Sequence, residues 1–162
     1  MVSWLQSILN WFNPSTVVLK GNAYPWTATV DGNDIVVSDV HATWFGGSDD
    51  PEDDGQTASG VSTALAPNYL GCALPLNYGP CSGSPIPRGI PWMTQVKVTN
   101  LDNEKQITVA LIDLGPSPPP RATAAIDLTQ AAFVDLGGDL KDGTIRVSYR
   151  VIGGAQYVPK TS

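Results

Sequence analysis

The sequence has little positive charge: 9 of its 162 residues are lysine or arginine, against 15 aspartates and glutamates. The formal net charge is -6, and this sign opposes the attraction to phosphate on which nucleic-acid binding depends. It equally opposes binding to anionic membranes or polymers. We therefore expect no nucleic-acid partner, and we expect any glycan ligand to be neutral and held by stacking and hydrogen bonds.

Metal-binding side chains are scarce, because His41 is the single histidine and Cys72 and Cys81 are the two cysteines. A four-ligand zinc site cannot be built from these side chains, so we predict no metal and no cofactor. The cysteines, close together in GCALPLNYGPC, allow two interpretations. We favour a disulfide that closes a small loop, as in proteins of an oxidising compartment, over two reduced and buried thiols.

Long apolar runs are also missing. No segment reaches the roughly 18 apolar residues that a transmembrane helix needs, so we expect no membrane span. The first residues lack the basic segment, apolar run and cleavage site of a secretory signal. We therefore expect either a mature form of a longer chain, or a protein that leaves the cell by lysis or inside a particle.

Glycine and proline are abundant, with 16 and 14 residues, in a chain that is 42% apolar and 15% charged. This composition is typical of a globular chain of short strands joined by many turns. A length of 162 residues fits a single domain with a sizeable core. We assign the domain to residues 21–162 and treat residues 1–20 as an amino-terminal extension.

The extension begins with apolar side chains at helical spacing over residues 1–13, and Ser3 and Gln6 are placed as a capping box. This pattern predicts a short amphipathic helix that ends at Asn13. Two roles stay open for the helix: packing on its own domain, or docking on a partner or a membrane surface.

Beyond Gly21 the apolar residues alternate with polar ones, which is the period of a strand. The predicted strands cover residues 24–30, 34–40, 40–45, 94–100, 106–112 and 144–152. Gly32 supplies the turn of a hairpin between the first two. Helical spacing follows Asp127, the predicted N-cap, and ends at Gly137, the predicted C-cap. We expect an all-β fold, a mostly antiparallel barrel or sandwich with one or two short helices.

Asp113 stands at the end of the apolar run 109–112 and precedes Gly115 and Pro116. Apolar surroundings disfavour the ionised form, so we expect a raised pKa for its carboxyl group, as a general acid requires. The alternative role is structural: the carboxylate caps the next turn by accepting backbone N–H bonds at Gly115 or beyond.

An acidic loop covers residues 49–54. Its carboxylates belong to Asp49, Asp50, Glu52, Asp53 and Asp54. We favour a solvated loop, and two other interpretations stay open. The loop supplies a second carboxylate that activates water in an inverting hydrolase, or three of its carboxylates converge on a calcium ion.

The segment 96–137 carries an ordered series of motifs: a strand that ends in Asp-x-Gly-Pro, a loop with an arginine, and an Ile-Asp-Leu-Thr stretch that leads into an alanine-rich helix ending in Leu-Gly. It resembles the second half of a double-psi β-barrel of the rare lipoprotein A type. The matching residues are Asp113, Gly115, Pro116, Arg121, Ile126, Asp127, Leu128, Thr129, Ala131, Ala132, Leu136 and Gly137. Residues 42–47, ATWFGG, are similar to the Thr-Trp-Tyr-Gly opening of expansins, so the resemblance covers about residues 40–152.

This resemblance implies a six-stranded double-psi β-barrel whose groove binds a cell-wall polysaccharide, most simply peptidoglycan. In lytic transglycosylases of this fold an aspartate at the groove floor protonates the glycosidic oxygen and then, as a base, assists closure of a 1,6-anhydro ring. On this basis Asp113 is the predicted general acid and base, and Thr43 orients the sugar. The histidine of the family is missing from residues 63–67, which puts an Asp–His mechanism in doubt.

Other residues are candidates for binding the substrate. Trp44, Tyr78 and Trp92 are suited to stacking on sugar rings, and core packing is the alternative for each. Arg121 and Asp127 complete the set of candidate substrate-binding residues. For Asp127 we favour a structural role, either as the helix cap or as the ion-pair partner of Arg121.

Two further functions stay open. One is a non-catalytic, expansin-like module that binds polysaccharide, because neither a histidine partner nor an evident second carboxylate accompanies Asp113. The other is a protein-binding barrel such as a protease inhibitor, with residues 75–89 as a rigid binding loop. For a wall-binding protein we expect an extracellular or cell-envelope location.

Overall fold

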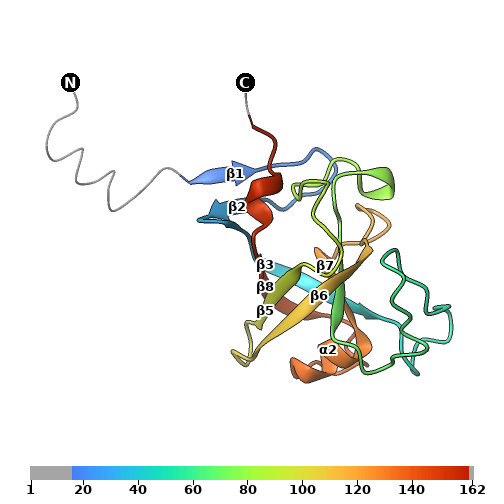
Figure 1. Ribbon diagram of the computed structural model, residues 1–162. Helices are drawn as coiled ribbons and strands as arrows, with labels where there is room; N and C mark the ends of the chain where they lie inside the picture. Colours follow the sequence, from blue (N-terminus) through green and yellow to red (C-terminus); the bar gives the residue numbers. More distant parts are fainter. Residues whose placement is uncertain (1–15, 161–162) are drawn as a thin grey trace, which may run out of the picture.

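The computed structural model describes residues 16–160, which form one mixed β-sheet that closes on itself (Figure 1). The strands are β1 (Val17–Leu19), β2 (Ala28–Asp31), β3 (Asp34–Phe45), β4 (Gly71–Leu74), β5 (Gln95–Asn100), β6 (Gln106–Leu114), β7 (Ile126–Thr129) and β8 (Ile145–Val151). Their order is β1-β2-β3-β7-β4-β6-β5-β8, and β8 also pairs with β3. The six strands from β3 to β8 therefore form a closed barrel, from which β1 and β2 extend.

Two pairings in the barrel are parallel, β3 with β7 and β4 with β6, and the others are antiparallel. The described helical elements are short: α2 (Gln130–Asp135) and the 3-10 turns η1 (Gly79–Cys81) and η2 (Gly154–Tyr157). The prediction of an all-β barrel with few helices is thus confirmed. The amphipathic helix predicted for residues 1–13 lies outside the described residues. Within residues 16–160, no helix is long and apolar enough to cross a bilayer.

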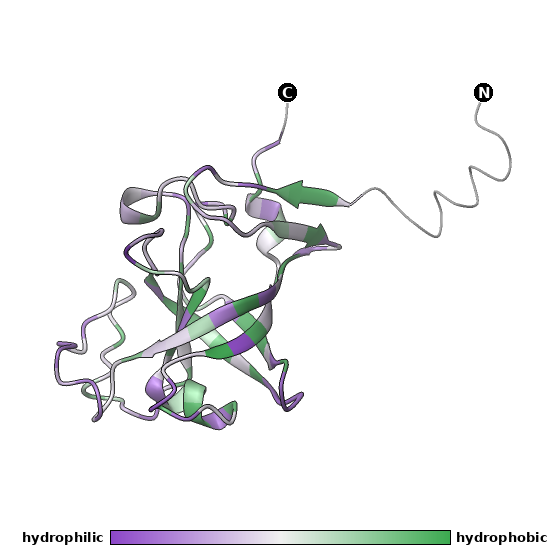
Figure 2. Cartoon of the chain, turned by 180° about the vertical axis from the view of Figure 1, so that it is seen from behind, coloured by the Kyte–Doolittle hydropathy of each residue, from purple (hydrophilic) through white to green (hydrophobic). Residues whose placement is uncertain are grey.

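The barrel core is built from alternate positions of its strands. Val96 and Val98 of β5 are fully buried, and Tyr149 and Val151 of β8 enter the same core. Figure 2 shows this alternation as green and purple bands along the strands. The Tyr149 hydroxyl donates to the carbonyl oxygen of Ala125 at 2.9 Å, which satisfies a polar group inside the core. The alternation predicted from the sequence is therefore confirmed for both strands.

Strand β4 lies inside the region 46–91, which the sequence presents as a long loop. All of its residues are buried, because β6 and β7 flank it inside the barrel. A strand buried on both faces has no alternation of polar and apolar residues and leaves no period-2 signal. The sequence therefore does not predict β4, which lies between β7 and β6 in the sheet.

The helix α2 begins later than the sequence predicts. Its N-cap is Thr129, whose hydroxyl oxygen accepts a bond from the Ala132 N–H at 3.4 Å. The prediction of Asp127 as the cap is wrong, since Asp127 belongs to β7 and pairs with both neighbouring strands. The predicted stop is confirmed: Gly137 has a φ of +86°, and the next N–H donates to the Phe133 carbonyl oxygen at 2.9 Å.

The predicted disulfide is wrong, because Cys72 and Cys81 are both free and buried. Cys72 lies on β4 in the barrel core. Cys81 lies in η1, where its Sγ donates to the carbonyl oxygen of Pro116 at 3.5 Å. Burial raises the pKa of both thiols, so each stays protonated in its own surroundings.

A thiol titration tests this correction. We expect the native protein to react very slowly with dithiobis(nitrobenzoate), because the reagent attacks exposed thiolates. After unfolding in guanidinium without reductant, both Cys72 and Cys81 should react at once. A protein that gains reactive thiols only after reduction would contain the disulfide and would contradict the structure.

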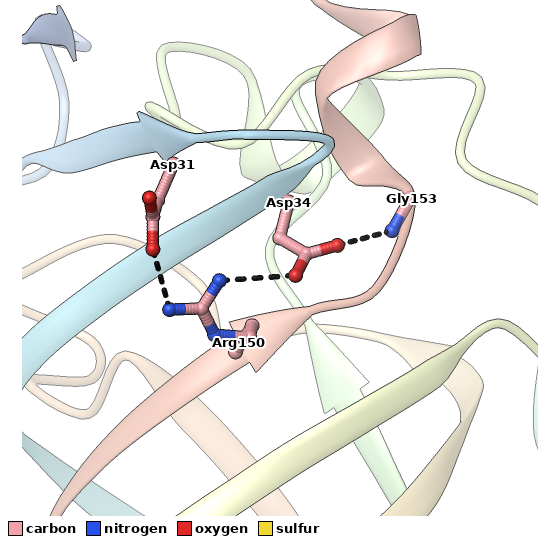
Figure 3. A network of polar contacts seen from close by, with 4 residues as sticks. All are labelled: Asp31, Asp34, Arg150 and Gly153. Atoms are coloured by element: carbon pink, nitrogen blue, oxygen red, sulfur yellow. Dashed lines mark hydrogen bonds and ion pairs between the residues drawn. The ribbon is translucent and has the colours of Figure 1, made fainter.

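A polar clamp attaches the β2–β3 hairpin to the barrel (Figure 3). The hairpin turns at Gly32, which has a φ of +59°, as predicted. Arg150 of β8 donates to Asp31 at 2.6 Å and to Asp34 at 3.0 Å, and the Gly153 N–H donates to Asp34 at 2.8 Å. The Gly153 bond, followed by Arg150, holds the pKa of Asp34 below its usual value. Ionised Asp34 therefore ties the turn to the end of β8.

The pH dependence of this clamp is testable with Asp34→Asn. We expect a loss of about 1 kcal/mol in the free energy of unfolding at neutral pH. Since the folded-state pKa is lowered, the contribution is present above about pH 4 and is lost as the pH falls through that lower value. Urea unfolding at neutral and acidic pH measures it. The control is Asp102→Asn, because the Asp102 side chain is 71% exposed and its Oδ1 is 3.7 Å from Arg146. Equal losses in the two variants would contradict the clamp.

Candidate functional site

A row of side chains crosses four neighbouring strands of the barrel. In the sheet register Thr43 of β3 lies opposite Asp127 of β7, and Ala73 of β4 lies opposite both Asp127 and Asp113 of β6. Residues paired in this way project from the same face of a sheet. The structure therefore brings together three candidates from the sequence, Thr43, Asp113 and Asp127.

A β-bulge in β6 places Asp113 in this row. Cys72 of β4 lies opposite Leu111, but the next residue, Ala73, lies opposite Asp113, so that Ile112 is an extra residue. The Ile112 side chain is fully buried. Without the bulge Ile112 would lie opposite Ala73, and Asp113 would point to the other face. Bulges that re-aim a side chain are common beside functional sites.

Asp127 is the carboxyl group with the most unusual environment in the row. The Thr43 hydroxyl donates to its Oδ1 at 3.1 Å. Burial, with a smaller contribution from the negative charges of Asp113, Asp50 and Asp53, raises the pKa of Asp127 to about 7, and the Thr43 bond opposes this rise. A carboxyl group of this pKa exchanges a proton near neutral pH, as a general acid must.

Asp113 has a different set of contacts. Its Oδ1 accepts the N–H groups of Leu114 and Ala58, both at 2.9 Å. The neighbouring Ser59 N–H donates to the Ile112 carbonyl oxygen at 2.9 Å. Asp113 thus ties the loop around residue 58 to the end of β6, rather than capping the turn at Gly115. Its Oδ2 accepts no hydrogen bond from the residues that the structure describes.

The acidic loop lies close enough to influence Asp127, since the charges of Asp50 and Asp53 raise its pKa. These two carboxylates accept backbone N–H bonds from Gly46 at 3.0 Å and Gly55 at 2.6 Å, respectively. Each is therefore oriented by its own loop. In the described part of the chain no three His, Cys, Asp or Glu side chains converge to hold a metal ion, so the calcium interpretation gains no support.

The other candidate residues lie apart from this row. Trp44 is next to Thr43 in β3, and its Nε1 donates to the Leu140 carbonyl oxygen at 3.3 Å in a cleft of about 610 Å³. Trp44 is partly buried against the core, which supports the packing alternative. Tyr78 and Trp92 share a separate cavity of about 370 Å³.

Arg121 is exposed in the proline-rich loop, and its backbone N–H donates to Pro118 at 3.2 Å. The predicted ion pair with Asp127 is wrong, because no such pair joins them among residues 16–160. Asp127 is instead flanked in β7 by the buried Ile126 and Leu128. The repeated Ile-Asp pair at 112–113 and 126–127 is the sequence signal that marks both aspartates. It does not say which of them is more deeply buried.

A comparison of Asp127→Asn with the unchanged protein tests the raised pKa. In the folded state Asp127 keeps its proton up to about pH 7, whereas in the unfolded state it loses the proton near pH 4. The stability that the bound proton contributes is therefore full at acidic pH and is lost as the pH rises through the folded-state pKa. At alkaline pH we expect the free energy of unfolding of Asp127→Asn to exceed that of the unchanged protein by on the order of 2 kcal/mol. Near pH 4 we expect no such increase.

Urea unfolding at the two pH values gives the difference. Asp142→Asn, at an exposed position, is the matched control and should show no pH-dependent gain. If Asp127→Asn has the same stability as the unchanged protein at alkaline pH, the raised pKa is refuted.

The comparisons with known proteins show a likeness among solved structures. No family model matches the chain, and no curated protein matches it. A solved structure, the Streptomyces papain inhibitor (SPI), is similar with 22% sequence identity and a TM-score of 0.48, covering 80% of this chain and 98% of the inhibitor. This likeness concerns the path of the chain and does not extend to ligands or activity.

Proposed function

We propose that the face with Thr43, Asp113 and Asp127 binds a neutral cell-wall polysaccharide, peptidoglycan in the simplest case, and cleaves it by acid catalysis. The observation that carries this proposal is the sheet register that places Thr43 and Asp113 in one row with Asp127, and the raised pKa of Asp127 agrees with it. A pair of carboxyl groups with different environments is typical of sites that cleave glycosidic bonds. The resemblance of the same motifs to double-psi barrels agrees with this choice of substrate.

Asp127 is the proton donor in this mechanism. Its Oδ1 is held by Thr43, and its Oδ2 has no donor among the described residues, so that Oδ2 is available to a substrate. The protonated carboxyl group gives its proton to the glycosidic oxygen as the bond from that oxygen to C1 breaks. The resulting carboxylate then takes the proton of the sugar's C6 hydroxyl as O6 bonds to C1. One carboxyl group serves both steps.

Asp113 is a positioning residue rather than the proton donor. Its charge raises the pKa of Asp127, which keeps that group protonated at higher pH. The same negative charge favours the positive charge that develops on the sugar ring in the transition state. Thr43 has the opposite influence on the pKa of Asp127 and orients its carboxyl group.

The finer fold assignment and the location belong to the same proposal. Two parallel pairings within a six-stranded barrel, β3–β7 and β4–β6, support the double-psi interpretation, since they join the strands that carry the motif residues. A wall polysaccharide as substrate would place the protein outside the cell or in the cell envelope.

Digestion of purified sacculi by the full chain tests the function. We expect soluble fragments with 1,6-anhydro ends, detected by mass spectrometry, and a rate that falls as the pH rises through about 7. Asp127→Asn should reduce the rate by at least about 10²-fold, because it removes the proton donor. Asp142→Asn should leave the rate unchanged.

Two further variants move the pH profile in opposite directions. Asp113→Asn removes a charge that raises the pKa of Asp127 and should shift the fall in rate to lower pH. Thr43→Val removes the bond that lowers this pKa and should shift the fall to higher pH. If no variant or unchanged protein releases fragments but all bind sacculi, the non-catalytic wall-binding alternative is correct. Absence of both release and binding refutes the polysaccharide proposal.

A further inference from the structure

The second surface of interest is a groove beside β1, on the extension outside the barrel. It has a volume of about 710 Å³. The residues that define this β1 groove are Val17, Val18, Leu19, Lys20, Asn77, Ser84, Pro85, Pro87, Arg88, Tyr157, Val158 and Pro159. The row of Thr43, Asp113 and Asp127 contributes no residue to it. The groove is therefore a site independent of the proposed glycan chemistry.

Among residues 16–160, strand β1 has a backbone edge without a strand partner. It pairs with β2 on one side, and within residues 16–160 its other edge makes no backbone hydrogen bond. Four consecutive residues, 17–20, line the groove, so the cavity follows the strand. Val17 and Val18 are 53% and 48% exposed. Such an edge is a template for the addition of one more strand.

The charge of the groove is opposite to that of the whole chain. Among the described residues that line it, the ionisable ones are Lys20, Arg88 and Tyr157, and none of them is a carboxylate. The ion pairs among the described residues are made by Arg146 and Arg150, which lie on β8. In a protein of net charge -6, the two cations of the groove select an acidic ligand.

Arg88 also lines a second cavity, of about 370 Å³, together with Tyr78 and Trp92. The loop beside Asn77 is tied by hydrogen bonds. The Gly83 N–H donates to the Asn77 side chain at 2.8 Å, and the Ala23 N–H donates to the Gly83 carbonyl oxygen at 3.1 Å. A preformed groove with cations beside apolar and aromatic surface lowers the cost of ordering on binding.

We propose that the β1 groove binds an extended acidic segment of a partner protein, which adds as a strand to the free edge of β1. A carboxylate of the segment lies between Lys20 and Arg88, and flanking apolar side chains contact Val17, Val18 and the aromatic cavity. An anionic polysaccharide would match the charge of the groove, but it would leave the backbone edge of β1 unused. The edge therefore favours a polypeptide.

The probe is a fluorescein-labelled peptide, Ser-Thr-Val-Glu-Val-Thr-Ser, titrated with the full chain and followed by fluorescence anisotropy. Two matched peptides test the two parts of the proposal: one with Gln in place of Glu, and one with N-methylated valines that cannot pair as a strand. We expect the first peptide to bind, with amide chemical-shift changes at residues 17–20. Each matched peptide should bind at least about tenfold more weakly.

Substitutions in the groove test where the carboxylate of the peptide binds. Arg88→Gln should weaken peptide binding by about tenfold, and Lys20→Gln should weaken it by about threefold. The control is Lys105→Gln, which changes the charge of an exposed lysine in the same way and should leave binding unchanged. The proposal is overturned if the Gln peptide binds equally well, if the shifts map elsewhere, or if no peptide binds. It is also overturned if polygalacturonate binds with the same dependence on Arg88 while the peptide does not.

Discussion

The register of β3 against its barrel neighbours is the constraint on which the rest of the structure depends. This strand of 12 residues pairs with β8 along its first part, which closes the barrel, and with β7 along its last part. A shift of one residue would turn the buried Ile35 and Val37 toward solvent, so the burial of apolar surface fixes the register. The same register places Thr43 beside Asp127. The polar row is thus positioned by apolar packing.

Two aspartates of the protein show opposite responses to their surroundings. Asp34 accepts bonds from Gly153 and Arg150, which favour its charged form, and it holds the hairpin to the barrel. Asp127 is partly buried among other carboxylates, and its charged form is disfavoured. Burial of such a group costs stability at neutral pH, and groups of this kind cluster where chemistry is done. This contrast separates a structural carboxylate from a candidate catalytic one.

Charge divides the surface into two proposed sites. The charges that raise the pKa of Asp127 are those of carboxylates, which suits a neutral polysaccharide and a proton donor. Along β1 the groove holds Lys20 and Arg88 and no carboxylate, and the backbone edge is unpaired within the described residues. The net charge of -6 is a sum over the whole chain and does not show this difference between the two surfaces. The two proposed sites are therefore suited to ligands of different chemistry.

The features that the sequence determined are those set by neighbouring residues: the alternation of apolar side chains in β5 and β8, the turn at Gly32 and the helix stop at Gly137. The tertiary structure alone decided the partners of groups that are far apart in the chain. Thr43 and Asp127 are separated by 84 positions, and Cys81 meets Pro116 across 35 positions rather than the nearer Cys72. The pKa of a carboxyl group and the pairing of a thiol depend on burial and on charges brought close by the sheet register. No local pattern in the sequence encodes those contacts.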